Sequence, residues 1–168
     1  MTAHIPTLSL SDVETPQFVS AIGEAYEHYG FVIIENHGIP QELIDRFLRQ
    51  FKTFFAWTES EKQRFHLKGG GGARGYTPFG IETAKGSAHF DLKEFWHIGR
   101  ELPEGHPYRH YMADNVWIDS IPGFRETCIE MFDMFDLTGR RLLTAIARVL
   151  KLAPDYFEDK VQLGNSVL

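Results

Sequence analysis

Two short segments of this sequence hold side chains whose types and spacing could do chemistry. The first, Arg74-Gly75-Tyr76, places a guanidinium and a phenol on either side of a glycine in a Gly-rich stretch. An arginine can bind a carboxylate through two parallel hydrogen bonds, so Arg74 and Tyr76 are candidates for binding a substrate carboxylate. The alternative is an arginine exposed to solvent in a surface loop.

The second segment, His89-Phe90-Asp91, has the spacing of two ligands of an iron site built from two histidines and one carboxylate. Such a site leaves coordination positions open for substrate and oxygen. It needs a further histidine on a neighbouring strand, and three follow downstream, at His97, His106 and His110. One motif without the other ligand is weak evidence for a site. A polar loop that leads into a strand explains the same residues, so we do not assign His89 and Asp91 as metal ligands.

Three other features favour structural roles. Residues 70–75 match G-x-G-x-x-G, but that pattern indicates a dinucleotide site only between a strand and a helix. Here a helical stretch precedes it and the proline-containing stretch 76–80 follows it. His37 lies in a turn without ligand-spaced neighbours, so we expect its ring to hydrogen-bond backbone carbonyls. Cys128 and Phe135 lie in the apolar stripe of a predicted helix, and both are expected in the core.

Composition excludes several classes of protein. The net charge of −6 argues against a nucleic-acid scaffold and against an anionic membrane surface as partner. No apolar run approaches the ~20 residues that span a membrane. An aromatic content of 14% indicates a folded, aromatic-rich core. The single cysteine allows no intrachain disulfide, and the N-terminus lacks the pattern of a signal peptide, so we expect a cytoplasmic protein.

Hydrophobic periodicity predicts an alternation of short strands and helices around the candidate residues. The first predicted elements are a strand over 5–10 and a helix that starts at Thr15-Pro16 and ends at Gly30. A strand over 31–35, covered on both faces, follows them. Helices over 41–55 and 59–65 follow, then a mobile loop over 66–89 with short extended pieces, and a strand over 94–98. After an irregular connector, a long helix runs over 123–152 and a short one over 154–159. A strand that begins at Val167 finds no sheet to join.

Six segments in order resemble the isopenicillin N synthase-like family of non-haem iron oxygenases. They are 5–10 ("IP.IDL"), 29–40 ("GFF.(V/I).NHGI"), Phe54-Phe55 with Glu61-Lys62 ("FF.L…EK"), Arg74-Gly75-Tyr76, Asp91-Leu92-Lys93-Glu94 ("D.KE"), and Asn165-Ser166-Val167-Leu168 ("NS.LR"). The resemblance covers essentially the whole chain. Isopenicillin N synthase has its substrate-binding arginine one position earlier, where this chain has Ala73, which argues against a penicillin-type substrate.

The resemblance implies Fe(II), bound by His, Asp and His on a double-stranded β-helix, with 2-oxoglutarate as a second chelating ligand and O2 and a small molecule as substrates. It implies an α+β fold, namely the N-terminal helical and β cap of a jelly-roll (cupin-like) oxygenase. Residues 1–122 would form the N-terminal non-haem dioxygenase domain. Residues 123–168 would provide the long helix, the short helix and the entry into the jelly roll. Most of the jelly roll, the iron ligands and the 2-oxoglutarate-binding Arg-x-Ser element would lie beyond Leu168.

Three functional hypotheses follow. In the first, the chain is the N-terminal part of an Fe(II)- and 2-oxoglutarate-dependent oxygenase and is inactive alone. In the second, it is a free-standing, non-catalytic binding module that keeps only the family's N-terminal cap. In the third, it is a small metalloenzyme that uses His89 and Asp91.

Overall fold

The computed structural model describes residues 4–168, which form two compact units. Unit 1 comprises the chain up to Pro40 together with residues 133–162, and unit 2 comprises residues 41–132 and 163–168. The division falls inside α4 (Phe124–Val149), so each unit holds part of this helix. The predicted domains, 1–122 and 123–168, have other bounds and stay a prediction.

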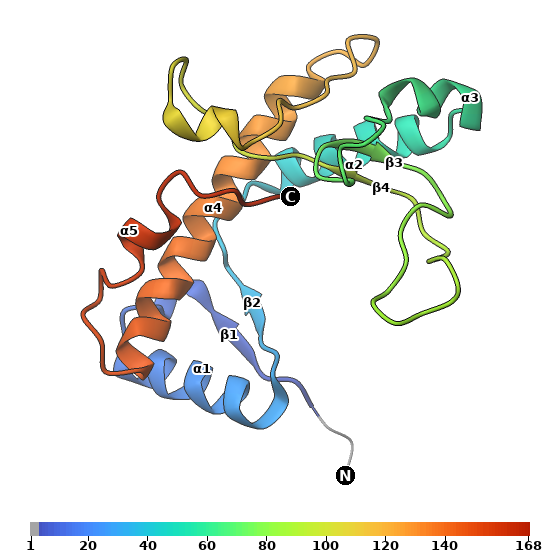
Figure 1. The fold of residues 1–168 in the computed structure, drawn as a ribbon. Coiled ribbons are helices and arrows are strands. Elements are labelled where there is room, and N and C mark those ends of the chain that lie inside the picture. Colours follow the sequence, from blue (N-terminus) through green and yellow to red (C-terminus); the bar gives the residue numbers. More distant parts are fainter. Residues whose placement is uncertain (1–3) are drawn as a thin grey trace. The chain divides into compact units, whose positions relative to one another are not determined.

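Unit 1 is built on two parallel strands, β1 (Thr7–Ser9) and β2 (Ile33–Glu35), joined by a 3-10 turn and α1 (Pro16–Tyr29). Figure 1 shows β1 and β2 side by side. In their register, Leu8 pairs with Ile34. Thr15 caps α1 by accepting a hydrogen bond from the Phe18 N–H. Gly30 ends the helix with a φ of 70°, as its glycine predicts.

The core of unit 1 joins α1 to the later turns of α4. Its fully buried members are Leu10, Val13, Phe18, Ile22 and Ala145. A Cβ at Gly23 would lie 3.0 Å from a methyl group of Val149, so the glycine allows close approach of the two helices. The helix α4 ends at Val149, three residues before the predicted end, because Lys151 adopts a left-handed conformation and Leu152 N–H bonds back to the Ala147 carbonyl.

Three predictions for unit 1 are wrong. Phe31 and Ile33 are more than half exposed, because β2 pairs only with β1 among the described residues and one face has no cover. Phe135, predicted in the apolar stripe of α4, is half exposed. The last short helix is α5 (Glu158–Val161) rather than 154–159, because the residues after Pro154 form successive three-residue turns instead of α-helical bonds.

Unit 2 contains α2 (Gln41–Phe55), α3 (Glu59–Lys62) and a 3-10 turn (Gln63–Phe65), followed by the strands β3 (Gly75–Thr77) and β4 (Phe95–His97). The strands pair antiparallel, with Tyr76 opposite Trp96. A second 3-10 turn, η3 (Pro107–His110), and the first turns of α4 complete the unit. The bounds of α2 agree with the prediction, and Glu61 caps α3, because its carboxylate accepts from the Thr58 N–H.

The core of unit 2 is a cluster of aromatic rings around Phe54. This side chain has no exposed surface and contacts five other rings, those of Phe55, Trp57, Phe65, Tyr76 and Trp96. Edge-to-face pairs of this kind stabilise a core beyond their buried area. The cluster fixes β3 and β4 against α2, and it thereby positions the candidate residues of the next section.

The end of the chain also joins unit 2. Ile98 and Leu168 exchange two backbone hydrogen bonds, of 2.9 and 2.8 Å, and Gly99 forms a bridge with Val167. The expectation that this segment has no sheet to join is therefore wrong, since it extends the pairing of β4. None of the helices in the described part of the chain is long and apolar enough to span a bilayer.

Candidate functional site

Arg74 is the most unusual charged residue of the described chain, because its side chain is buried. It is 2% exposed, and its Nη1 and Nη2 donate to the Ala73 carbonyl at 2.6 Å and to Asn165 Oδ1 at 3.0 Å. Its Nε has no hydrogen-bond partner, and no carboxylate of residues 4–168 pairs with it. Burial lowers the pKa of the guanidinium from its ordinary value.

Two glycines make room for this arginine. Gly75 has a φ of 69°, and a Cβ there would lie 2.7 Å from the Phe65 carbonyl oxygen, so the turn into β3 requires glycine. A Cβ at Gly99 would lie 1.9 Å from the Arg74 Cζ. The guanidinium therefore packs directly on the backbone that follows β4.

Tyr76 belongs to a buried group of three polar side chains. Its hydroxyl donates to Glu94 Oε2 at 2.5 Å, and the same carboxylate accepts from Lys62 Nζ at 2.7 and 3.0 Å. The ammonium also lies 5.7 Å from the centre of the Tyr76 ring. Burial, and secondarily the hydrogen bond to Glu94, raises the pKa of Tyr76, so its hydroxyl stays protonated.

The sequence placed Arg74 and Tyr76 in a mobile loop, and the structure instead buries both, because β3 pairs with β4. Their predicted role in substrate binding is untested and stays a prediction. Sequence reasoning missed Lys62 and Glu94 as their neighbours. Both residues lie in segments that resemble the family, and a buried lysine or glutamate is expected to be paired.

His89 and Asp91 lie apart from this group, in the loop before β4. The Asp91 carboxylate pairs with Lys93 at 3.4 Å, and the His89 backbone N–H donates to the Ser87 hydroxyl. No three His, Cys, Asp or Glu side chains of residues 4–168 are grouped as a metal site would require. The described residues therefore do not fit an iron ion.

The other singled-out residues have structural contacts. His37 Nδ1 accepts from the Ile39 N–H at 3.1 Å, so its ring bonds the backbone, but through an N–H group and not through the carbonyls that were predicted. His97 Nδ1 donates to the carbonyl of Gly72 at 2.7 Å, inside the glycine-rich stretch. That stretch leads into β3 and not into a helix, which argues against a dinucleotide site. Cys128 is buried in the aromatic core.

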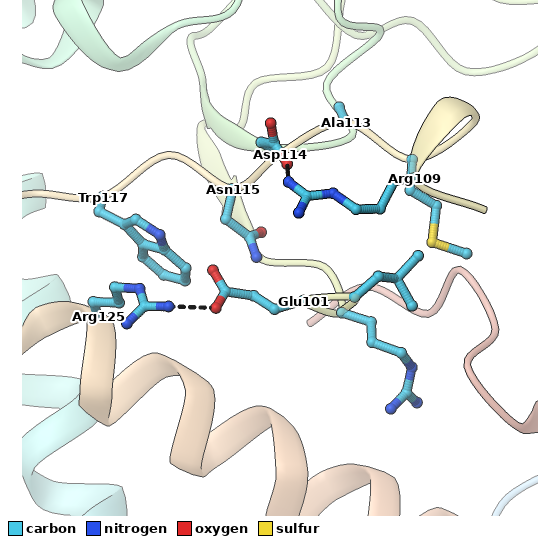
Figure 2. A pocket seen from close by; sticks show the side chains of 10 residues that line it. Glu101, Arg109, Ala113, Asp114, Asn115, Trp117 and Arg125 are labelled. Carbon is cyan, nitrogen blue, oxygen red and sulfur yellow. Dashed lines mark hydrogen bonds and ion pairs between the residues drawn. The ribbon is translucent and has the colours of Figure 1, made fainter. Parts of the chain in front are cut away.

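A polar cavity of about 360 Å³ lies elsewhere in unit 2. Figure 2 shows Arg125 pointing toward Glu101 and Arg109 toward Asp114, with the ring of Trp117 beside Arg125. These residues form no sequence motif, because they come from three separate segments.

Comparison with known proteins identifies the fold. The family model described as "non-haem dioxygenase in morphine synthesis N-terminal" matches residues 5–120. A probable iron/ascorbate oxidoreductase of Dictyostelium discoideum is 32% identical over 151 residues, 83% of this chain and 41% of the relative. A 2-oxoglutarate-dependent dioxygenase of a Dothideomycetidae species is 30% identical over 166 residues, 92% of this chain and 43% of the relative.

A solved structure agrees with these matches. The crystal structure of a putative 2OG-Fe(II) oxygenase family protein from Caulobacter crescentus has a TM-score of 0.87 and 43% sequence identity, covering 99% of this chain and 55% of that one. The chain thus spans about half the length of the proteins it matches. It belongs to the family of non-haem Fe(II)- and 2-oxoglutarate-dependent oxygenases.

Proposed function

We propose that this chain is the N-terminal part of an Fe(II)- and 2-oxoglutarate-dependent oxygenase that oxidises a small organic molecule with O2. The observation that carries the proposal is the match to the Caulobacter crescentus structure, which includes 99% of this chain but 55% of that chain. In such enzymes Fe(II) and 2-oxoglutarate supply the activation of O2, and the protein supplies binding and orientation. The resemblance to the family implies that the iron ligands lie in the remaining half of the enzyme, and residues 4–168 contain no group of three His, Cys, Asp or Glu side chains that could replace them.

The exposed face of the β1–β2 sheet supports this proposal. This sheet has two strands in the described part of the chain, and a two-stranded sheet is marginally stable in water without further cover. Phe31 and Ile33 expose apolar side chains on β2. In the proposed enzyme, further strands of a jelly roll cover these residues and remove the open edges.

Within the proposed enzyme, Arg74 binds a carboxylate of the substrate. A buried guanidinium is costly unless an anion compensates its charge, and Arg74 has a donor without a partner and no carboxylate nearby in the described chain. Tyr76 has its hydroxyl on Glu94, so its role is to hold β3 and thereby Arg74 in place. The role of Arg74 as a direct contact is tested by Arg74→Gln, which should raise KM for a carboxylate substrate at least about tenfold. Arg49, an exposed arginine on α2, offers the matched control Arg49→Gln.

The proposed activity is tested on the full gene product. With Fe(II), 2-oxoglutarate and O2, it should form succinate, and the 168-residue chain alone should form none. A full product that neither binds iron nor forms succinate would refute the proposal and favour the non-catalytic binding module. Iron uptake by residues 1–168 that is lost in a His89→Ala, Asp91→Ala double variant would instead support the small metalloenzyme.

A further inference from the structure

The polar cavity of unit 2 has the size and lining of a ligand site. Its volume of about 360 Å³ is within the usual range for small-molecule pockets. The lining comes from three segments, the chain after β4, the turn η3 with the residues that follow it, and the first turn of α4. The residues are Arg100, Glu101, Leu102, Arg109, Met112, Ala113, Asp114, Asn115, Trp117 and Arg125.

Positive charge exceeds negative charge in this lining. Three guanidiniums and two carboxylates line the cavity, in a protein whose net charge is −6, and Arg100 is itself engaged, with its Nε on the Gly164 carbonyl. Arg125 Nη2 contacts Glu101 Oε2 at 2.5 Å, and Arg109 Nη2 contacts Asp114 Oδ1 at 2.9 Å. Each contact joins one nitrogen to one oxygen and leaves the other donors of Arg109 and Arg125 without a hydrogen-bond partner among residues 4–168. A guanidinium has five such donors in a planar fork that matches an oxyanion.

The pair of Arg109 and Asp114 is the one that an incoming anion can replace. The Asp114 side chain is 84% exposed, and exposed ion pairs contribute little to stability. An oxyanion that takes both terminal nitrogens of Arg109 would make two charge-assisted bonds where the protein makes one. Asn115 fixes the backbone of the site, because its amide forms a reciprocal pair with the Gly99 backbone, at 2.8 Å in each direction.

The cavity also has an apolar wall. The Trp117 ring lies with its centre 5.8 Å from the Arg125 guanidinium carbon, and Leu102 and Met112 complete the wall. A ligand with an apolar body next to its charge would contact both kinds of lining. We propose that this cavity binds a small organic carboxylate, with the carboxylate on Arg109 and the apolar body against Trp117. The proposal does not rest on the oxygenase function, because the cavity shares no residue with the Arg74 site.

Benzoate is a suitable probe, measured by isothermal titration with the purified full chain without iron or 2-oxoglutarate. We expect saturable binding that falls at least about tenfold in Arg109→Gln, because a charge-assisted pair is lost. Arg109→Lys should be weakened by less, since it keeps the charge but loses the fork. Arg49→Gln should bind as the unchanged protein does, and circular dichroism should show that every variant is folded.

Two further probes test the chemistry of the ligand. Benzamide, a neutral molecule of the same shape, should bind at least about tenfold more weakly than benzoate. Inorganic phosphate should also bind more weakly, because it has no apolar body to contact Trp117. The proposal is overturned if benzoate does not bind, if benzamide or phosphate binds as tightly, or if Arg109→Gln keeps the original affinity.

Discussion

Breaking the buried ion pair of Lys62 and Glu94 by one substitution should be among the most destabilising single changes in unit 2. The two side chains are 9% and 16% exposed and lie 2.7 Å apart. At an effective dielectric constant of about 20, their Coulomb attraction is about 6 kcal/mol before desolvation is subtracted. Lys62→Met keeps the aliphatic stem and removes the ammonium, so Glu94 remains buried without its cation. Removing one partner of such a pair costs about 3–5 kcal/mol.

A double variant shows whether the cost of Lys62→Met comes from the unpaired charge of Glu94. In Lys62→Met with Glu94→Gln, no buried charge is left, and Tyr76 can still donate its hydroxyl to the new amide oxygen. We therefore expect the double variant to be more stable than Lys62→Met alone, by about 2 kcal/mol or more. The exposed pair of Lys93 and Glu82, at 2.5 Å, is the matched control. Lys93→Met should cost far less stability than Lys62→Met, because an exposed ion pair contributes little.

Urea unfolding followed by tryptophan fluorescence is the appropriate assay. All three tryptophans lie in unit 2, and Trp57 and Trp96 contact Phe54 in the same aromatic cluster as Tyr76. The fluorescence change therefore reports the unfolding of the unit that holds the pair. The stabilising role of the pair is refuted if Lys62→Met lowers the free energy of unfolding no more than Lys93→Met does. It is also refuted if the effects of Lys62→Met and Glu94→Gln simply add in the double variant.

Four other predictions concern stability, measured in the same way or by circular dichroism. Gly75→Ala should cost at least about 2 kcal/mol, because it adds a backbone clash to a left-handed φ, whereas Gly105→Ala, with a similar φ and open space, should cost only about 1 kcal/mol. Gly139 lies inside α4 with open space at its Cβ, so Gly139→Ala should increase the free energy of unfolding by about 0.5–1 kcal/mol. A decrease in that free energy would contradict the helix at this position. Thr15→Ala should cost about 1 kcal/mol through the lost cap of α1. Burial raises the pKa of the Cys128 thiol to about 12. Between about pH 8.5 and 12 this thiol therefore ionises in the unfolded chain but not in the folded one. Stability should fall there by up to about 1.4 kcal/mol per pH unit, and Cys128→Ala should remove that part of the slope.

The sequence predicted those elements whose signals act within a few residues. Thr15 and Gly30 define the ends of α1, and the apolar stripe of 41–55 has the bounds of α2, because caps and helical periodicity are local. The strand pairings were less predictable. Leu168 pairs with Ile98, and no local pattern of the last four residues indicates this partner.

The burial of Arg74 could not be predicted for the same reason. Its sequence neighbours are small residues and glycines, which are typical of an exposed loop. What covers the side chain comes from elsewhere, since Asn165 lies 91 positions later and Gly99 follows β4. A contact between distant segments leaves no periodic signal in either of them.

Three of the segments that resemble the family meet in one hydrogen-bonded group. Lys62 comes from the segment with Glu61, Tyr76 from the segment with Arg74, and Glu94 from the segment with Asp91. Each of these side chains has the right chemistry for catalysis, yet each is paired with another in the core of unit 2. This leaves Arg74 as the buried member of those segments that has no ion pair in residues 4–168 and has a donor without a partner. The structural role of the paired residues is thus the physical reason to look for the substrate at Arg74 rather than at Tyr76.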